Sequence, residues 1–185
     1  MIVTDTPLPP VVLVTFDPFT DSRGRFQRLH CQREFEAHGL PGPIVQTSLS
    51  QSARRGTVRG MHFQMPPSKE AKLVRCLRGA IHDVVIDLRF HAKTFLQHFA
   101  TELDSGSNHS LYVPPGFAHG FQTLEDDTQV LYQMTDFYSP ELASGVRWDD
   151  PTFGIVWPLA VSEMSSKDAD FPDFDPRTDL GFVSE

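Results

Sequence analysis

The segment Ile81-His82-Asp83-Val84-Val85-Ile86-Asp87-Leu88 decides the fold. One alternate set of its residues is apolar apart from His82, and the other set contains Asp83 and Asp87. Alternation with a period of two is typical of a β-strand, because successive side chains point to opposite faces. We therefore expect a strand with one apolar face and a second face that carries polar groups into a cavity.

Further short strands are expected on both sides of this segment. Runs of β-branched and aromatic residues are separated by turn clusters such as Asp104-Ser105-Gly106 and Pro114-Pro115-Gly116. The runs cover residues 11–16, 44–50, 73–77, 95–103, 110–113, 117–124 and 128–138. Only residues 32–38 read clearly as a helix. About eight strands predict an all-β sandwich or barrel, with a single domain over residues 1–185.

Charge is distributed unevenly in the sequence. The net charge of −8 and the pI near 5.4 argue against binding to a nucleic-acid polymer, which favours a basic surface. Residues 54–78 nevertheless contain seven arginines and lysines, and their only acidic residue is Glu70. This local basic segment favours a small phosphorylated ligand. The alternative is a solvated face of ordinary surface charges.

The cysteine content and the hydropathy pattern indicate in which cellular compartment the protein is found. Cys31 and Cys76 are too few for a disulfide framework, and Cys76 fits a buried, inert thiol. No apolar run is long enough to cross a bilayer or to serve as a signal peptide. The sequence therefore predicts a cytoplasmic protein without a membrane partner.

The basic segment contains the motif Arg59-Gly60-Met61-His62-Phe63-Gln64, and Lys72 follows eight residues after Gln64, the last residue of the motif. The histidine is a proton acceptor, and an arginine and a lysine lie close to it in sequence. Two fixed positive charges beside a base suit an anionic substrate and a developing oxyanion. The motif therefore indicates the core of an enzyme site.

Several longer motifs follow one another along nearly the whole chain. They are Asp21-Ser22-Arg23-Gly24, the Arg59 to Gln64 motif, Lys72-Leu73-Val74-Arg75-Cys76, Pro115-Gly116-Phe117-Ala118-His119-Gly120-Phe121, Tyr138-Ser139-Pro140 and Ser166-Lys167-Asp168. In this order they resemble the nucleotide-sugar 3,5-epimerases typified by dTDP-4-dehydrorhamnose 3,5-epimerase. The resemblance implies a cupin-type jelly roll, which is an all-β double-stranded β-helix with few short helices. It also implies a homodimer.

For the reaction, the resemblance implies that a hydrogen next to a ketone is removed as a proton and that a proton returns to the opposite face. His62 is then the base, Asp168 orients it, and Tyr132 is the donor from the other face. Lys72 is the cation for the enolate oxygen. Because the substrate ketone is itself the electron sink, no metal or organic cofactor is expected.

Each of these four residues also has a structural interpretation. His62 fits a buried histidine bonded to backbone, Tyr132 a core tyrosine, and Lys72 a surface lysine on a strand. Asp168 lies in Ser165-Ser166-Lys167-Asp168, which fits a capping box at a helix start. The charged residues close to His62 favour the catalytic interpretation.

The resemblance further implies a set of residues that bind a nucleotide diphosphate sugar. They are Arg23, Phe26, Gln46, Ser48, Arg59, His119, Tyr138 and Lys167. Arginine suits forked contacts with phosphate, and Tyr138 matches the aromatic residue that stacks on the thymine ring. Four positions depart from the family pattern, namely Arg28, Thr47, Ser48 and Ala143. The identity of the sugar, and the choice between C3, C5 or both, therefore stay open.

Two other functions are compatible with the sequence. Pro115-Gly116-Phe117-Ala118-His119 resembles the second motif of metal-dependent cupin oxygenases. Such a protein needs about three converging ligands, commonly with a His-x-His pair, and the position two after His62 is Gln64. The altered recognition residues also suit a non-catalytic module that binds nucleotide sugars.

Overall fold

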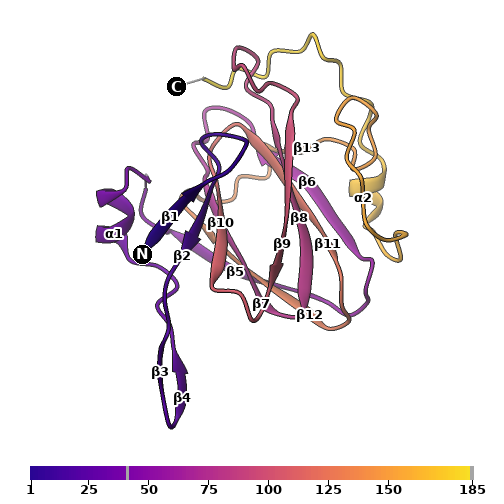
Figure 1. Ribbon diagram of the computed structural model, residues 1–185. Coiled ribbons are helices and arrows are strands. Elements are labelled where there is room, and N and C mark those ends of the chain that lie inside the picture. Colours follow the sequence, from indigo (N-terminus) through magenta and orange to yellow (C-terminus); the bar gives the residue numbers. More distant parts are fainter. Residues whose placement is uncertain (41, 184–185) are drawn as a thin grey trace.

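Two antiparallel β-sheets packed face to face form the body of the protein (Figure 1). The computed structural model describes residues 1–40 and 42–183. The first sheet has the strand order β1-β2-β10-β7-β12-β5. Its strands are β1 (Ile2–Asp5), β2 (Val12–Thr15), β5 (Gln46–Ser52), β7 (Lys72–Arg78), β10 (His109–Val113) and β12 (Thr128–Met134).

The second sheet has the strand order β13-β6-β11-β8-β9. Its strands are β6 (Val58–Gln64), β8 (Ala80–Asp87), β9 (His98–Asp104), β11 (Phe117–Thr123) and β13 (Ala143–Gly145). From β5 to β13 the chain passes repeatedly from one sheet to the other, as in the expected double-stranded β-helix. Segments far apart in sequence therefore build the two walls of one interior.

The main core fills the space between the sheets. Val74 and Val130 come from the first sheet, and Ile81, Val85 and Phe121 come from the second. All five are almost completely buried. Burying one side chain of this size contributes about 1.5–3 kcal/mol. Since Ile81 and Val85 point inward, Asp83 between them also points inward, as the alternation in this segment predicts.

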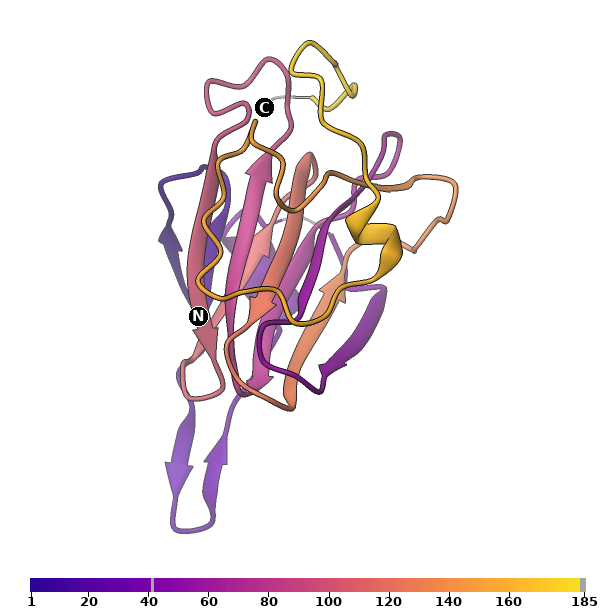
Figure 2. The ribbon, with the colours of Figure 1, turned by 90° about the vertical axis from the view of Figure 1, so that its right-hand side faces the viewer.

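Smaller cores cover the outer faces of the sheets. Phe35 of helix α1 (Gln32–Ala37) packs against the first sheet, where it contacts Tyr112 edge to face. The segment after β13 crosses the outer face of the second sheet (Figure 2) and buries Phe153 and Phe182 there. This segment contains the short helix α2 (Ser166–Ala169). Within the described residues, no helix is long and apolar enough to span a membrane.

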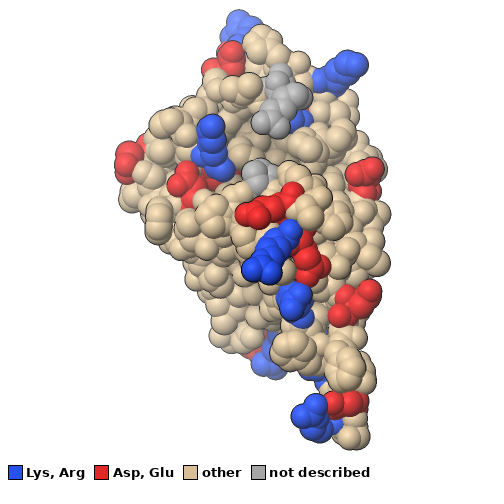
Figure 3. Space-filling view, turned by 90° about the vertical axis from the view of Figure 1, so that its left-hand side faces the viewer, with Lys and Arg blue, Asp and Glu red and all other residues tan. Residues whose placement is uncertain are grey.

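A two-stranded hairpin projects from the body (Figures 1 and 2). It consists of β3 (Phe19–Asp21) and β4 (Gly24–Phe26), and all six strand residues are exposed. At its tip, where Figure 3 shows basic and acidic side chains together, Arg23 Nη2 lies 2.6 Å from Asp21 Oδ2. Phe19 and Phe26 are 68% and 75% exposed. The hairpin thus leaves two large aromatic side chains open to solvent.

The structure confirms the predicted all-β class with few short helices, but it corrects several boundaries. Residues 95–97 precede β9 and residues 135–138 follow β12, so these two predicted strands were too long. Five strands were not predicted, namely β1, β3, β4, β6 and β13. The omission of β6 matters most, because it carries the motif around His62.

Candidate active site

An open cavity of about 860 Å³ lies between the two sheets. Strands β5, β7 and β12 contribute to one wall, and β6 and β11 contribute to the other. The cavity brings together all the predicted site residues except Arg23 and Phe26. They are Gln46, Ser48, Arg59, His62, Lys72, His119, Tyr132, Tyr138, Lys167 and Asp168.

A bulge in β6 places Arg59 and His62 in the same cavity. In a regular strand, residues three apart point to opposite faces. Here His62 pairs with His119 and Arg59 pairs with Phe121, so the register shifts by one residue between them. Gly60 has a φ of +126°, and a Cβ atom there would lie 2.5 Å from the Cα of Gly120. Only glycine fits this close approach of the two strands.

His62 forms a close pair with Asp168 of helix α2. His62 Nε2 lies 2.7 Å from Asp168 Oδ1, and the backbone N–H of Gly60 donates to Asp168 Oδ2 at 3.2 Å. The histidine side chain is 41% exposed, while that of Asp168 is 7% exposed. Because Nε2 is engaged, Nδ1 is the ring nitrogen that can accept a proton from a bound molecule.

The cap of helix α2 and the pair with His62 use different atoms. Ser165 is the N-cap, and its hydroxyl accepts a hydrogen bond from the backbone N–H of Asp168 at 3.1 Å. Burial raises the pKa of Asp168, but hydrogen bonds from His62, Gly60 and Ser165 outweigh it and hold the pKa below its usual range. The carboxylate therefore stays charged beside His62.

Tyr132 approaches the cavity from the opposite sheet, on β12. Its ring packs against His119 and Phe121, with centroid distances of 6.0 and 6.4 Å. Burial is the main cause that raises the pKa of its phenol, and the negative charge of Asp83 adds to it, whereas Arg59 acts in the other direction. The phenol of Tyr132 therefore stays protonated, on the wall opposite the one that carries His62.

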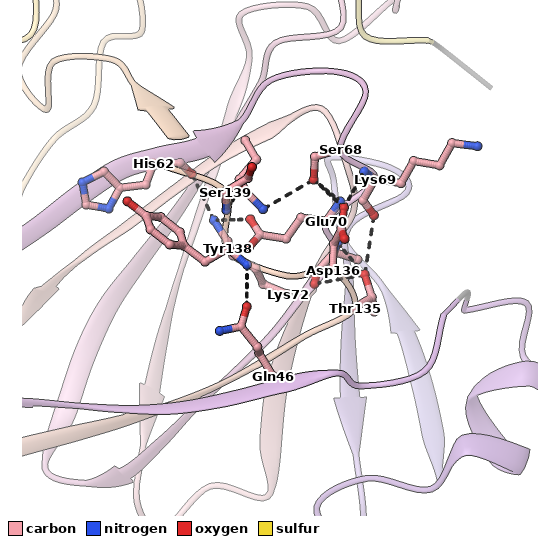
Figure 4. A network of polar contacts seen from close by, with 12 residues as sticks. Gln46, His62, Ser68, Lys69, Glu70, Lys72, Thr135, Asp136, Tyr138 and Ser139 are labelled. Atoms are coloured by element: carbon pink, nitrogen blue, oxygen red, sulfur yellow. Dashed lines mark hydrogen bonds and ion pairs between the residues drawn. The ribbon is translucent and has the colours of Figure 1, made fainter. Parts of the chain in front are cut away.

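Lys72 is placed next to the same histidine. Its Nζ donates to the backbone carbonyl of His62 at 3.3 Å and lies 3.2 Å from Glu70 Oε2 (Figure 4). Glu70 also lines the cavity, although the sequence analysis gave it no role. Its position as the only acidic residue in the basic segment 54–78 is the sequence signal that could have identified it. The cavity therefore contains a lysine cation with a carboxylate beside it.

A second histidine–aspartate pair lies on the neighbouring strands. His119 Nε2 is 2.6 Å from Asp83 Oδ1, and the two side chains are 3% and 0% exposed. Sequence alternation predicted that Asp83 faces inward, but it did not identify His119 as the partner. The pairing depends on the register of β8 and β11, which aligns Phe121 with Asp83 and His119 with Val85.

Gln64 occupies the position where a metal-dependent cupin commonly has its second histidine. Its amide is engaged with the segment after β12: its Nε2 donates to the carbonyl of Phe137 at 3.1 Å, and its Oε1 accepts from the N–H of Ser139 at 2.7 Å. Within residues 1–40 and 42–183, no group of three or more His, Cys, Asp or Glu side chains is arranged to hold a metal ion.

The predicted departures from the family pattern divide into two groups. Ser48 and Ala143 line the cavity. Arg28 does not line it, and its Nη1 pairs instead with Glu34 Oε1 at 2.8 Å. Thr47 is exposed on β5, next to Ser48. Two of the four departures therefore alter the cavity wall itself.

The comparisons with known proteins agree with this architecture. The sequence model of the family described as dTDP-4-dehydrorhamnose 3,5-epimerase matches residues 5–176. The enzyme of that name from Sinorhizobium fredii is 42% identical over 163 residues, which cover 88% of this chain and 84% of that protein. A dTDP-4-dehydrorhamnose 3-epimerase from Streptomyces niveus is 38% identical over 158 residues, covering 85% of this chain and 76% of that protein.

A crystal structure of a protein with the same family name has the same fold as this chain. The dTDP-4-dehydrorhamnose 3,5-epimerase from Bacillus anthracis, solved with TDP and PPi bound, has a TM-score of 0.90 and 38% sequence identity to this chain. The match covers 94% of this chain and 99% of that one. This likeness, together with the sheet topology, confirms the expected jelly-roll class.

Proposed function

The chain belongs to the dTDP-4-dehydrorhamnose 3,5-epimerase family, and we propose that it inverts C3, C5 or both in a dTDP-linked 4-keto-6-deoxy sugar. The family consists of isomerases that act on carbohydrates. One observation carries the proposal for this chain. His62 and Tyr132 come from opposite sheets and line the same cavity, which is the arrangement that inversion requires.

The proton transfers follow from this arrangement. His62 Nδ1 removes the proton from the carbon next to the C4 ketone, and Asp168 stabilises the imidazolium that forms. The electron pair of the broken C–H bond moves onto the ketone oxygen, where the Lys72 ammonium stabilises the enolate. The phenol of Tyr132 then protonates the carbon from the other face. Exchange with water restores both residues for the next turnover.

The same residues serve C3 and C5, because both carbons adjoin the C4 ketone. The relatives include both a 3,5-epimerase and a 3-epimerase by name. The position of the sugar ring between His62 and Tyr132 then decides which carbon reacts. Ser48 and Ala143, the two departures that line the cavity, are the residues we expect to influence that position.

The basic residues around the cavity suit the diphosphate. Arg59 lies on β6 beside His62, and Lys167 is exposed on helix α2 at the edge of the cavity. The ring of Tyr138 is 58% exposed, and its backbone N–H donates to the side chain of Gln46 (Figure 4). An exposed aromatic ring on an anchored backbone suits stacking on a nucleobase. His119 and Ser48 complete the proposed binding set.

We propose no metal or organic cofactor, because the ketone accepts the electron pair. The fixed amide of Gln64 favours this epimerase over the metal-dependent alternative. A biosynthetic role in the cytoplasm, without nucleic-acid or membrane partners, is part of the same proposal and accords with the acidic net charge of −8.

We also propose a homodimer in which the β3–β4 hairpin reaches a second copy. Arg23 and Phe26 do not line the cavity of their own chain, and the hairpin projects from the body (Figure 1). If these residues contact substrate, it is the substrate of the partner. The exposed rings of Phe19 and Phe26 would gain burial from that contact.

Complementation between inactive variants tests this dimer. Arg23→Ala and His62→Asn each damage every site in their own homodimers. In a mixed dimer, one cavity has an intact His62 facing an intact Arg23, so activity should return when the two proteins are mixed. Sedimentation should show a dimer. Activity that stays lost after subunit exchange has been demonstrated would contradict the shared site.

Proton NMR in deuterated water tests the reaction. The protein is incubated with dTDP-4-dehydro-6-deoxy-D-glucose and with other 4-keto nucleotide sugars. Deuterium should enter at C3, C5 or both, with inversion at the exchanged carbon. Binding without any exchange would support the non-catalytic module instead, and activity that depends on an added metal ion would support the oxygenase.

A further inference from the structure

Glu70 is a buried carboxylate within the cavity that the proposed mechanism does not use. Its Oε2 lies 3.2 Å from Lys72 Nζ, and the exposed fractions of the two side chains are 9% and 15%. We propose that Glu70 is a positioning residue, which fixes the Lys72 ammonium and keeps it charged for enolate stabilisation. This inference deepens the proposed function and rests on it.

The contacts of Lys72 show how it is positioned. An ammonium group has three N–H donors. One points to the backbone carbonyl of His62 at 3.3 Å and another lies toward Glu70 (Figure 4), which leaves one for the substrate oxygen. Because the carbonyl belongs to His62, the same residue carries the base and fixes the cation. Their separation is therefore set within one short stretch of β6.

Glu70 is itself held in place by a polar network (Figure 4). Its backbone N–H donates to Ser68 Oγ at 3.2 Å, and that hydroxyl donates to Asp136 Oδ2 at 2.8 Å. Gln64 Nε2 donates to the same hydroxyl at 3.4 Å. The network joins the end of β6 to the segment that follows it and to the segment that follows β12. These bonds fix the backbone from which the Glu70 side chain extends to Lys72, so the pair forms with a smaller loss of chain freedom.

The charge of Glu70 matters because Lys72 is largely buried. Burial favours the neutral amine, whereas a carboxylate within about 4 Å favours the ammonium. Among the described residues, Glu70 is the only carboxylate in an ion pair with Lys72. Two further carboxylates line the cavity, but each has another partner: Asp168 pairs with His62, and Glu163 pairs with Arg54. The remaining titratable groups of the lining are Arg59, His119, Tyr132, Tyr138 and Lys167. Glu70 is therefore the carboxylate that directly compensates the charge of Lys72.

Glu70→Gln separates the charge from the shape, because glutamine keeps an oxygen acceptor at almost the same place. We expect the alkaline limb of the pH–rate profile to move down by about 1–3 pH units, so that kcat on that limb falls by about 10–10³-fold. KM should change only a few-fold. Glu70→Asp keeps the negative charge on a shorter side chain, so its alkaline limb should lie between those of Glu70→Gln and the wild type.

The matched control is Asp127→Asn. Asp127 Oδ2 lies 4.0 Å from Arg78 Nη2 at the other end of β7, both side chains are exposed, and neither residue lines the cavity. Asp127 has a φ of +51°, which asparagine also adopts. This variant removes a carboxylate that pairs with a cation on the same strand as Lys72. Its pH–rate profile should match that of the wild type.

A readout without turnover separates this inference from the proposed function. Trace labelling with acetic anhydride across a pH series, followed by mass spectrometry, reports the protonation of Lys72. The labelling midpoint of Lys72 should fall by about 1–3 pH units in Glu70→Gln and stay unchanged in Asp127→Asn. An unchanged midpoint would overturn the inference. A wild-type protein that exchanges no sugar would instead contradict the proposed function, whatever the midpoint does.

Discussion

The protein contains two histidine–aspartate pairs of nearly equal geometry on neighbouring strands. His62 and His119 are aligned across β6 and β11, and their Nε2 atoms lie 2.7 and 2.6 Å from the oxygens of Asp168 and Asp83. Their burial differs widely. The side chain of His62 is 41% exposed and that of His119 is 3% exposed. The first pair joins helix α2 to the sheet, and the second joins two strands within it.

This difference shows that environment assigns the role of a chemical pair. A half-exposed imidazole can exchange a proton with a substrate and then with water. A fully buried imidazole has no access to water, and a change of its charge would be uncompensated in the interior. A buried pair also becomes costly when one partner is lost, because the other is left uncompensated. We therefore expect the His62 pair to control turnover and the His119 pair to control stability.

The largest expected effect comes from His62→Asn. Loss of a general base typically costs about 10²–10⁴ in rate, so hydrogen exchange at every epimerised carbon should fall by at least that factor. Stability should change less than on loss of the fully buried pair, because the His62 side chain is 41% exposed and asparagine can still donate a hydrogen bond toward Asp168. His91→Asn is the control: His91 Nε2 lies 3.7 Å from Asp179 Oδ2, outside the cavity. Near-normal exchange in a folded His62→Asn protein would show that another group takes the proton.

A crossed comparison of Asp83→Ala and Asp168→Ala should follow. Breaking the fully buried pair should lower the free energy of unfolding by about 3–5 kcal/mol. Water can solvate His62, so Asp168→Ala should cost less stability. Its turnover should instead fall roughly 10- to 100-fold, which corresponds to one charge-assisted hydrogen bond of about 1.5–3 kcal/mol. Denaturant unfolding measures the loss of stability, and kcat measures the loss of turnover. Equal losses of stability and of turnover in the two variants would contradict the different roles of the two pairs.

The smallest effect concerns acid stability. The pKa of Asp168 in the folded protein lies below its unfolded value of about 3.9, since hydrogen bonds outweigh the burial that raises it. Its contribution to stability is complete above that value and disappears as the pH falls through the folded pKa. Unfolding measured from pH 6 downward should show a weaker acid dependence in Asp168→Asn than in the wild type. Parallel curves would contradict the shift.

Strand prediction from the sequence was correct where one face of the strand is buried, and it missed strands in which the alternation of polar and apolar residues is broken or absent. Residues 81–88 alternate regularly and form most of β8. In β6, the bulge at Gly60 changes the phase between Arg59 and His62, so a search for a period of two misses the strand. The strands of the hairpin have three residues each and are wholly exposed, so they have no burial pattern to detect.

The candidate site was predictable as a set of residues but not as contacts. The roles of His62, Tyr132, Lys72 and Asp168 stay predictions, although the structure places all four around one cavity. The pair between His119 and Asp83 depends on strand register, and the contact between Lys72 and the carbonyl of His62 depends on how the sheets pack. Such distances arise from tertiary structure and leave no local trace in the sequence.

The most direct test of inversion between opposite walls is Tyr132→Phe in deuterated water, followed by proton NMR. The change removes only the hydroxyl, and the ring contacts with His119 and Phe121 should remain. His62 can still remove a proton and return a deuteron to the same face. We predict that deuterium enters the sugar without inversion. Equal loss of exchange and inversion in the folded variant would contradict the assignment of Tyr132 as the donor from the opposite face.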